Sequence, residues 1–205
     1  NAVAITGNHD ELTAALVTAG TKVEVSAATV TVNDGDGTAI TATELSAIGG
    51  STTGQVTVTN AVAITGDHDQ LTAALVTAGT KVVVSNATVT VNDANTTAIT
   101  AAELSAIGGA TTGTVTVTNA VAITGSVAEV TAALVTAGTL VEVSNAAVTV
   151  TGTPSISELN AIAAKTTGVV TATLAANSLA NLDALTTAST DVITITVNDA
   201  DAAAL

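Results

Sequence analysis

The sequence predicts an α/β solenoid, in which coils of strand, corner, strand and helix stack with parallel β-sheets and one helical side, about seven coils in all. Three observations lead to this fold class: a period of 59 residues, short alternating β-branched runs, and alanine-rich stretches with helix-start signals between those runs. Aromatic residues, methionine and cysteine are absent from the 205 residues. The core must therefore consist of small aliphatic side chains, which favours many thin layers over one thick core.

The repeat is visible in the sequence itself. The run Asn-Ala-Val-Ala-Ile-Thr-Gly begins at Asn1 and recurs at Asn60 and Asn119, each 59 residues after the last. Ten positions differ between residues 1–59 and 60–118, so 49 of 59 are identical. Residues 119–176 form a degenerate copy and 177–205 a partial one. A period in this range is typical of stacked repeat proteins, and we expect residues 1–205 to form a single repeat array.

Alternating runs of valine, isoleucine and threonine predict two strands in each coil. Residues 56–61 and 62–67 form one such pair, and residues 80–87 and 88–93 form the next. Glu24 and Glu142 occupy equivalent strand positions in the first and third repeats. The corner between paired strands usually holds an asparagine, whose amide can bond the backbone of a neighbouring bend. We expect these corner residues to form a structural ladder: Asn60, Asn86, Asn119 and Asn145, with Ala27 as the exception.

The alanine-rich stretches carry an apolar face at helical spacing. In the second repeat this face is Leu71, Ala74, Leu75 and Ala78. The inward leucines of the three repeats are expected to be Leu16, Leu75 and Leu134. Six helix starts fit a capping box, in which the cap side chain accepts from the N3 amide and the N3 side chain accepts from the cap amide; they begin at Asn8, Thr41, Asp67, Thr100, Ser126 and Ser155. Five glycines are expected to end helices in the left-handed conformation: Gly20, Gly50, Gly79, Gly109 and Gly138.

The charge of the chain excludes one class of partner. Seventeen acidic residues against three lysines give a formal net charge of −14, and there is no arginine. Nucleic-acid binding is therefore not expected, because no basic patch could neutralise phosphates. No apolar run approaches the roughly 20 residues that a membrane-spanning helix needs, so we also expect no membrane span.

Few residues could carry chemistry. His9 and His68 lie one period apart, each beside an aspartate, where a metal site or a general base is the alternative interpretation. The third repeat has Val127 at this position, and we interpret the histidines as part of a solvated first helical turn. No serine lies in a nucleophile elbow, and the paired glycines lack the other residues of a phosphate loop. We expect no enzymatic activity.

Acid-rich turns before some helices are further metal candidates. Residues 33–37, Asn-Asp-Gly-Asp-Gly, resemble an oxygen-rich calcium loop, and residues 92–95 and 198–201 are their counterparts. Calcium takes six to eight oxygen ligands, and the second copy has lost one acid and both glycines. We therefore expect no cofactor, and a polar turn is the favoured interpretation. The weak calcium candidates are Asp34, Asp36, Asp93 and Asp199.

Thr-x-Thr pairs recur along the strands and suggest an alternative function. Both hydroxyls of a pair point to one side of a strand, and stacking would make a regular array. The pattern resembles the ice-binding faces of β-solenoid antifreeze proteins, although threonine is also a good outward partner for inward valine. Because the pairs fall alternately before and after the corner, we expect them to divide between two faces. Glycan binding is a further alternative, and the absence of aromatic residues counts against it.

Several blocks carry a resemblance to a known class: Thr-Val-Thr-Val-Asn-Asp, Thr-Ala-x-Glu-Leu-Ser-Ala-Ile and Thr-Thr-Gly-x-Val-Thr-Val-Thr. They are similar to the Ala/Thr/Val-rich tandem repeats of giant secreted bacterial proteins, such as cyanobacterial cell-surface, adhesin-like and S-layer-associated proteins. The resemblance implies an extracellular, cell-surface location and a structural role in a fibre, surface layer or adhesin stalk. It implies no catalytic residue.

The partners expected are other copies of the same repeats. The sequence opens and closes inside a repeat, so we expect it to associate end to end or to continue in a longer chain. Contacts with a cell surface or matrix would follow from the location that the resemblance implies.

Overall fold

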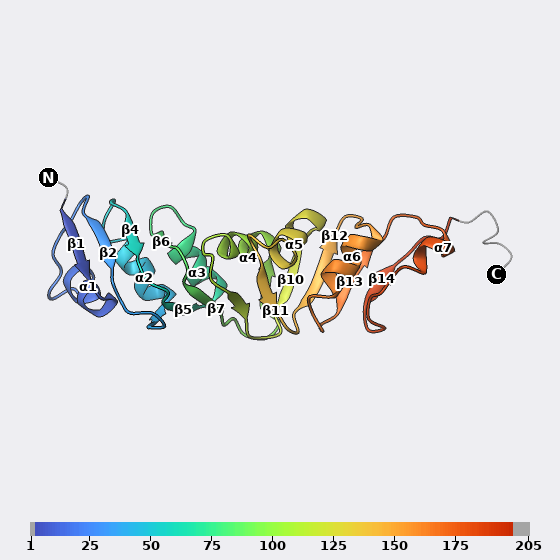
Figure 1. Ribbon diagram of the computed structural model, residues 1–205, viewed down its shortest axis with the longest axis horizontal. Helices are drawn as coiled ribbons and strands as arrows, with labels where there is room; N and C mark the ends of the chain where they lie inside the picture. The colour runs from blue at the N-terminus through green and yellow to red at the C-terminus, as the bar shows by residue number, and fades with distance from the viewer. Residues whose placement is uncertain (1–2, 199–205) are drawn as a thin grey trace. The chain divides into compact units, whose positions relative to one another are not determined.

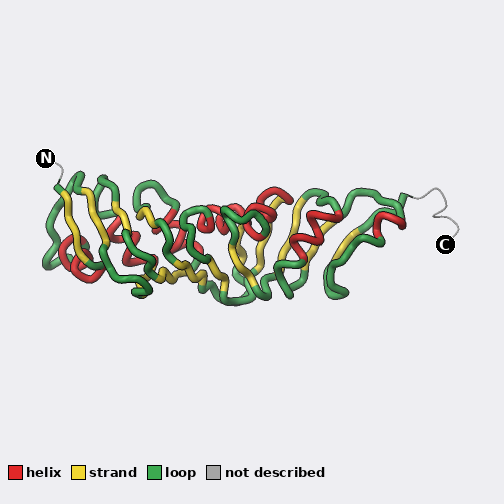
Figure 2. Tube along the Cα trace, viewed as in Figure 1, coloured by secondary structure: helices red, strands yellow, loops and turns green. Residues whose placement is uncertain are grey.

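The computed structural model describes residues 3–198. They belong to two compact units, which are described separately. The first unit extends to Asp93 and includes Ala106–Val117, and the second contains Ala94–Ser105 and the residues from Thr118 onward. Both consist of repeated β-α units, and helices, strands and short loops alternate along the trace (Figures 1 and 2). The prediction of an α/β repeat architecture with parallel sheets is thereby confirmed.

Two parallel sheets form the first unit. The first sheet has the order β1-β2-β4-β6, and the second contains β3, β5, β7 and β9 as successive neighbours. The strands of the first sheet are β1 (Ala4–Gly7), β2 (Thr29–Val32), β4 (Val56–Val58) and β6 (Val82–Val84). Those of the second are β3 (Ala39–Thr41), β5 (Ala63–Gly66), β7 (Thr88–Val91) and β9 (Val115–Val117). The chain crosses from the first sheet to the second at each corner, from β2 to β3, β4 to β5 and β6 to β7.

The second unit contains the third parallel sheet, in the order β14-β13-β12-β10-β8. Its strands are β8 (Ala98–Thr100), β10 (Ala122–Ser126), β12 (Ala147–Thr151), β13 (Val170–Thr173) and β14 (Val192–Thr194). Strand β11 (Val141–Val143) also belongs to this unit. In most strands of the three sheets, inward valines and isoleucines alternate with outward alanines and threonines, the period-two pattern read from the sequence; Val83 on β6 and Val192 on β14 are outward exceptions.

Seven helices lie in the described part of the chain. They are α1 (His9–Leu16), α2 (Ala42–Gly49), α3 (His68–Leu75), α4 (Ala101–Gly108), α5 (Val127–Leu134), α6 (Ile156–Ala163) and α7 (Leu179–Leu182). The six predicted capping boxes are all present, each with both reciprocal hydrogen bonds. The predicted inward leucines, Leu16, Leu75 and Leu134, are buried. No helix among residues 3–198 has the length and apolarity that crossing a membrane requires.

Helices α2 and α4 end directly before Gly50 and Gly109, as predicted, although Gly50 has a φ of −76° and is not left-handed. The other three predicted helix ends are wrong. Helices α1, α3 and α5 stop well before Gly20, Gly79 and Gly138, and the positive-φ glycines among the described residues are Gly37 and Gly152. A threonine hydroxyl binds the last-turn carbonyl instead: Thr80 Oγ1 donates to Ala73 O at 2.5 Å, and Thr139 Oγ1 to Ala132 O at 2.5 Å. Thr21 makes the same contact with Ala14 O. These side chains satisfy carbonyls that a left-handed glycine would otherwise cap.

A Thr-Thr-Gly turn in each of the three repeats binds the backbone of the preceding corner. Thr52 Oγ1 donates to Ala28 O at 2.8 Å, and Thr53 Oγ1 donates to Ser26 O at 2.6 Å. Gly54 lies so close that a Cβ there would be 2.1 Å from Ala28 O. The turn recurs as Thr111–Gly113 on Ala87 and as Thr166–Gly168 on Ala146. Glycine is required here by the close approach of two backbones.

One predicted strand does not form. Residues 23–25 of the first repeat lie outside any strand, whereas the equivalent residues form β6 and β11. Lys22 and Glu24 make an exposed ion pair at this position, with Nζ 3.3 Å from Oε1. Sequence pattern alone therefore does not produce a strand at this position.

Candidate functional site

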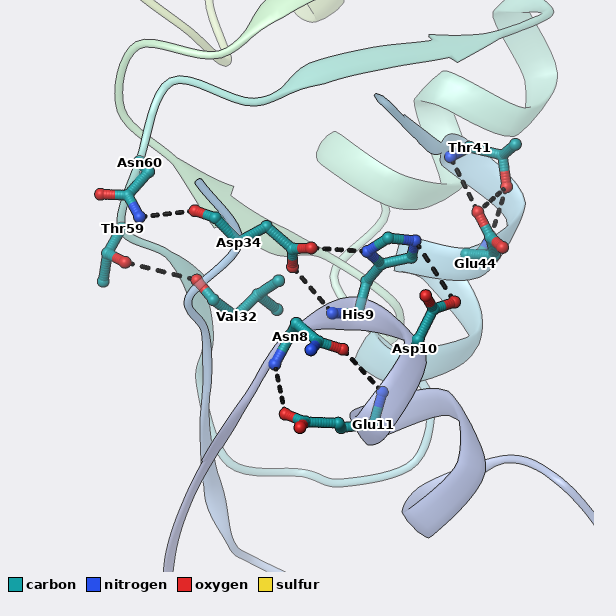
Figure 3. A network of polar contacts seen from close by, with 10 residues as sticks. All are labelled: Asn8, His9, Asp10, Glu11, Val32, Asp34, Thr41, Glu44, Thr59 and Asn60. Carbon is teal, nitrogen blue, oxygen red and sulfur yellow. Dashed lines mark hydrogen bonds and ion pairs between the residues drawn. The ribbon is translucent and has the colours of Figure 1, made fainter. Parts of the chain in front are cut away.

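The most organised polar cluster joins α1 to the loop after β2. Asp34 Oδ2 accepts the backbone N–H of His9 at 2.7 Å, and Asp34 Oδ1 lies 2.7 Å from His9 Nδ1 (Figure 3). On the other side of the ring, His9 Nε2 is 3.6 Å from Asp10 Oδ1. The side chain of Asp34 is only 5 % exposed and that of His9 is 14 % exposed. A buried carboxylate thus binds both a helix N-terminal amide and an imidazole.

Local structure places both partners. The capping box of Asn8 and Glu11 fixes the first turn of α1, so the amide of His9 points out of the helix end. Strand β2 pairs with β1 and ends at Val32, which brings Asp34 to that amide. Asn60, from the next corner, donates from Nδ2 to Asp34 O at 2.5 Å. The cluster therefore ties three successive segments of the first unit together.

Electrostatics favour a protonated His9. Burial acts to lower the pKa of His9, but the hydrogen bond and charge of Asp34, with the charges of Asp10 and Glu44, outweigh it and raise the pKa above 6.5. Glu44 belongs to the capping box of α2. The pKa of Glu44 is lowered by the hydrogen bonds from the Thr41 hydroxyl and amide, and the charge of His9 adds to this effect.

The second repeat contains the same arrangement. Asp93 Oδ2 accepts the amide of His68 at 2.8 Å, Asp93 Oδ1 lies 2.7 Å from His68 Nδ1, and His68 Nε2 is 3.6 Å from Asp69 Oδ1. The third repeat has Val127 and Gly152 at the equivalent positions. Both partners are therefore replaced together in the third repeat. The Val127 side chain takes the place of the imidazole, and its Cγ2 lies 3.9 Å from where a Cβ added to Gly152 would be.

The interpretation of His9 and His68 as solvated residues is wrong, because both side chains are largely buried against an aspartate. Sequence reasoning missed the pairing and assigned the two aspartates to another role. A signal was present: both pairs are separated by 25 residues, and both members change in the same repeat. Two positions that change together are candidates for contact.

The calcium candidates have protein partners in the structure. The carboxylates of Asp34 and Asp93 bind histidines, and Asp36 Oδ1 accepts the amide of Ala61 at 2.9 Å. Asn95 accepts the amide of Ala120 in the same way, at 3.0 Å. Asp199 lies outside the described residues. Within residues 3–198, no group of three or more His, Cys, Asp or Glu side chains is arranged to hold a metal ion.

The four corner asparagines lie at bends between strands, and their contacts differ. Asn60 makes a bond between coils, to Asp34 O. The Oδ1 atoms of Asn86 and Asn145 accept locally from the preceding serine hydroxyls, at 3.2 and 3.4 Å. Asn119 occupies the bend between β9 and β10. Asn60 therefore makes the kind of amide bond between coils that the predicted ladder requires.

Threonines form one column on each sheet. The paired residues are Thr6, Thr31 and Thr57 on the first sheet, followed by Val83. On the second sheet they are Thr41, Thr65, Thr90 and Thr116, and on the third Thr100, Thr124, Thr149 and Thr171. In the second sheet the adjacent outward column begins with Ala39 and Ala63, so the threonine array there is one residue wide at that end. The expected division between two faces is wrong: Thr31, which follows a corner, lies opposite Thr57, which precedes one, and Thr90 lies opposite Thr116 in the same way.

A shallow cavity of about 600 Å³ lies at the C-terminal end of α2, beside Lys81. Three of its hydroxyls make structural hydrogen bonds: Ser51 Oγ donates to Ile48 O at 2.7 Å, and Thr52 and Thr53 bind the preceding corner. Ser26 and Lys81 also line the cavity.

Together these features define a protein of repeated β-α units whose chemistry-bearing side chains bind neighbouring segments of the same chain. Comparisons with protein-family models, with curated proteins and with solved structures found no match.

Proposed function

We propose that this chain is a structural repeat module of an extracellular fibre, surface layer or adhesin stalk, which assembles or continues end to end. One observation carries the proposal: the same contacts between coils recur from repeat to repeat. The Thr-Thr-Gly turn occurs three times and the His–Asp pair twice, each time joining a coil to the next. A contact that repeats at a fixed interval is the requirement for growth along one direction. Continuous stacking of the coils as an α/β solenoid is part of this proposal.

The side chains support a structural role. His9, Asp34, His68 and Asp93 hold helix starts against neighbouring loops, and this use leaves their reactive atoms facing other carboxylates or amides. The absence of cysteine and methionine removes the side chains most easily oxidised outside a cell. The extracellular location itself rests on the sequence resemblance to secreted surface repeats.

Electron microscopy of the purified chain tests the proposal, together with sedimentation at micromolar concentration. Filaments or ordered sheets are expected, with sedimentation well above that of a 19.5 kDa monomer. Circular dichroism of the same sample is the control, because ordered assemblies of folded modules retain helical signal and amyloid does not. A monodisperse 19.5 kDa particle at every concentration would contradict assembly of this chain by itself.

The threonine columns favour ice binding as the second candidate. Neighbouring strands present hydroxyls at the regular spacing of about 4.8 Å that parallel pairing imposes. Thermal hysteresis measures this function directly. Replacing Thr65 and Thr90 by valine should abolish any hysteresis if the second-sheet column binds ice, whereas the same change at the buried Thr111 should alter stability instead.

A further inference from the structure

The first repeat exposes apolar side chains that the other repeats bury. Val3 is 57 % exposed, whereas its equivalents Val62 and Val121 are both 0 % exposed. Val23 is 58 % exposed, whereas Val82 and Val141 are 1 % exposed. Equivalent valines in nearly identical sequences thus differ in solvent exposure, so the exposure is decided by the segments that pack against them.

Two further positions behave in the same way. Ile5 and Ala15 are partly exposed, whereas their second-repeat equivalents, Ile64 and Ala74, are fully buried. Val3 and Ile5 lie in or beside β1, Ala15 lies on α1, and Val23 follows that helix. These four residues are called the open face below.

The second repeat shows what covers such a face. Strand β5 pairs with β3, where Ala63, Ile64 and Thr65 lie opposite Ala39, Ile40 and Thr41. Ala63 N donates to Thr38 O at 2.8 Å. Strand β6 pairs with β4, where Val82 lies opposite Val56. Both covering strands flank α2, so one segment, residues 38–58, covers the whole face.

The third repeat repeats the first part of this contact. Strand β8 has the sequence Ala-Ile-Thr, like β3, and pairs with β10, where Ile99 lies opposite Ile123. Ala122 N donates to Thr97 O at 2.8 Å. The second and third sheets therefore place an Ala-Ile-Thr strand beside an Ala-Ile-Thr-Gly strand. In the first sheet, β1 has the sequence Ala-Ile-Thr-Gly, and its pairing partner among the described residues is β2.

The glycine at the end of each of these covered strands lies close to the helix of the covering segment. A Cβ on Gly66 would lie 2.8 Å from the Cβ of Ala42, and a Cβ on Gly125 would lie 2.8 Å from the Cβ of Ala101. Both alanines are the first residues of the helices that follow β3 and β8. Gly7 is the equivalent glycine, and the atoms nearest to a Cβ added there belong to Glu11 and Leu12 of its own repeat.

The unformed strand at residues 23–25 has the same cause. Short parallel strands form by pairing, and the equivalent residues of the second repeat pair with β4. The valines of residues 23–25 match those of β6, but no such partner lies beside them among the described residues. Among the described residues, the edge of β1, helix α1 and residues 23–25 therefore all lack the neighbour that residues 38–58 provide for the second repeat.

We propose that the open face binds, on a neighbouring polypeptide, a half-repeat of the residue 38–58 type: an Ala-Ile-Thr strand, a capped helix beginning with alanine, and a Val-Thr-Val strand. The argument is continuity with the contact already made inside this chain by β3, α2 and β4. The inference rests on the proposed structural role and names the surface and the partner through which assembly occurs. The strand joins β1 in parallel, so the amides of Ala4 and Thr6 become donors to it, as Ala63 N is to Thr38 O.

A synthetic peptide of residues 36–59 tests the proposal on the intact chain. Bound peptide should slow hydrogen exchange of the Ala4 and Thr6 amides about tenfold or more and extend protection to residues 23–25. The matched control is the same peptide with Ala42→Leu, which is more apolar but would collide with Gly7. On the protein, Gly7→Ala should abolish peptide binding and leave the fold intact. The nearest atom to the added methyl group is Glu11 Oε2 at 3.1 Å, and the next, Glu11 Cβ and Leu12 Cγ, are at ordinary contact distances of 3.4 and 3.5 Å.

The outcomes separate clearly. Protection by the first peptide and not by the Ala42→Leu peptide supports the proposal, and protection by both would show non-specific adsorption and overturn it. If neither peptide binds, a chain with residues 36–59 fused ahead of Asn1 shows whether the segment can cover the face at all. If the fused segment protects the amides but the added peptide does not bind, the proposal that the partner lies on a neighbouring polypeptide is wrong. If neither the peptide nor the fused segment protects the amides, the open face is not a binding surface for this segment. Filaments seen despite such a failure would leave the proposed function standing with a different contact.

Discussion

His9 Nδ1 and Asp34 Oδ1 lie 2.7 Å apart although 25 residues separate them, and the second repeat reproduces the contact at the same distance. The carboxylate also accepts the helix amide of His9, so one buried group satisfies two donors from the start of α1. Such a pair stabilises the junction of two coils, because loss of either partner leaves the other buried without its hydrogen bonds.

Replacing Asp34 by alanine should lower the free energy of unfolding by about 1–3 kcal/mol, because the amide and ring N–H of His9 lose their acceptor. Urea denaturation measures the change. Asp10→Ala is the control, since the Asp10 side chain is 86 % exposed and its 3.6 Å contact with Nε2 is solvated. Equal effects of the two substitutions would show that the Asp34 contact does not stabilise the fold.

The combination found in the third repeat should be tolerated better than its parts. His9→Val with Asp34→Gly reproduces Val127 and Gly152 and removes donor and acceptor together. We expect the double variant to be more stable than the sum of the single losses by roughly 0.5–3 kcal/mol. A double-mutant cycle in urea gives this coupling, and strict additivity would contradict the contact.

Stability should depend on pH through His9. The fold raises the pKa of His9, so its stabilising contribution is complete below 6.5 and is lost as pH rises through the folded-state value above 6.5. Titration of the ring protons by NMR measures the pKa, and unfolding at several pH values measures the stability. His9→Gln should flatten this part of the profile relative to the parent, and a His9 pKa at or below 6.5 would contradict the prediction.

Leu75 tests the packing of the helices. It is 1 % exposed on α3, and Leu75→Ala should lower the free energy of unfolding by roughly 2–5 kcal/mol if the site cannot collapse. Val83→Thr is the control: Val83 is exposed on β6 opposite Thr57, so the threonine would continue an existing column. A loss under about 0.5 kcal/mol for Leu75→Ala would mean that α3 does not pack as described.

Two glycines should respond in opposite ways to alanine. At Gly54 the added Cβ would lie 2.1 Å from Ala28 O, so Gly54→Ala must displace the turn from its corner and destabilise the fold. At Gly20 no atom lies within 4 Å of the added Cβ, and Gly20→Ala should be neutral or slightly stabilising. Thermal unfolding compares the two variants, and similar melting temperatures would contradict the close approach at Gly54.

Local signals explain which features were predictable from sequence. The capping boxes at Asn8, Thr41 and Ser126 need only residues three apart, so their helix starts could be read directly. The inward positions of Val30, Leu75 and Ile123 follow from the two-residue and 3.6-residue periods. The ends of α1, α3 and α5 were not predicted because the capping group is a threonine seven residues from its carbonyl, as in Thr80 with Ala73, and no short-range motif indicates it.

The sequence by itself determined the repeat, the element types, the helix starts and the aliphatic core, because each depends on residues close together in the chain. Only the tertiary structure decided that Asp34 binds His9, that residues 23–25 stay outside a strand while the equivalent 82–84 form β6, and that Val3 is exposed while Val62 is buried. Each of these depends on a partner distant in the sequence, or on its absence among the described residues. Strand pairing and burial belong to pairs of segments, so near-identical repeats can differ wherever their neighbours differ.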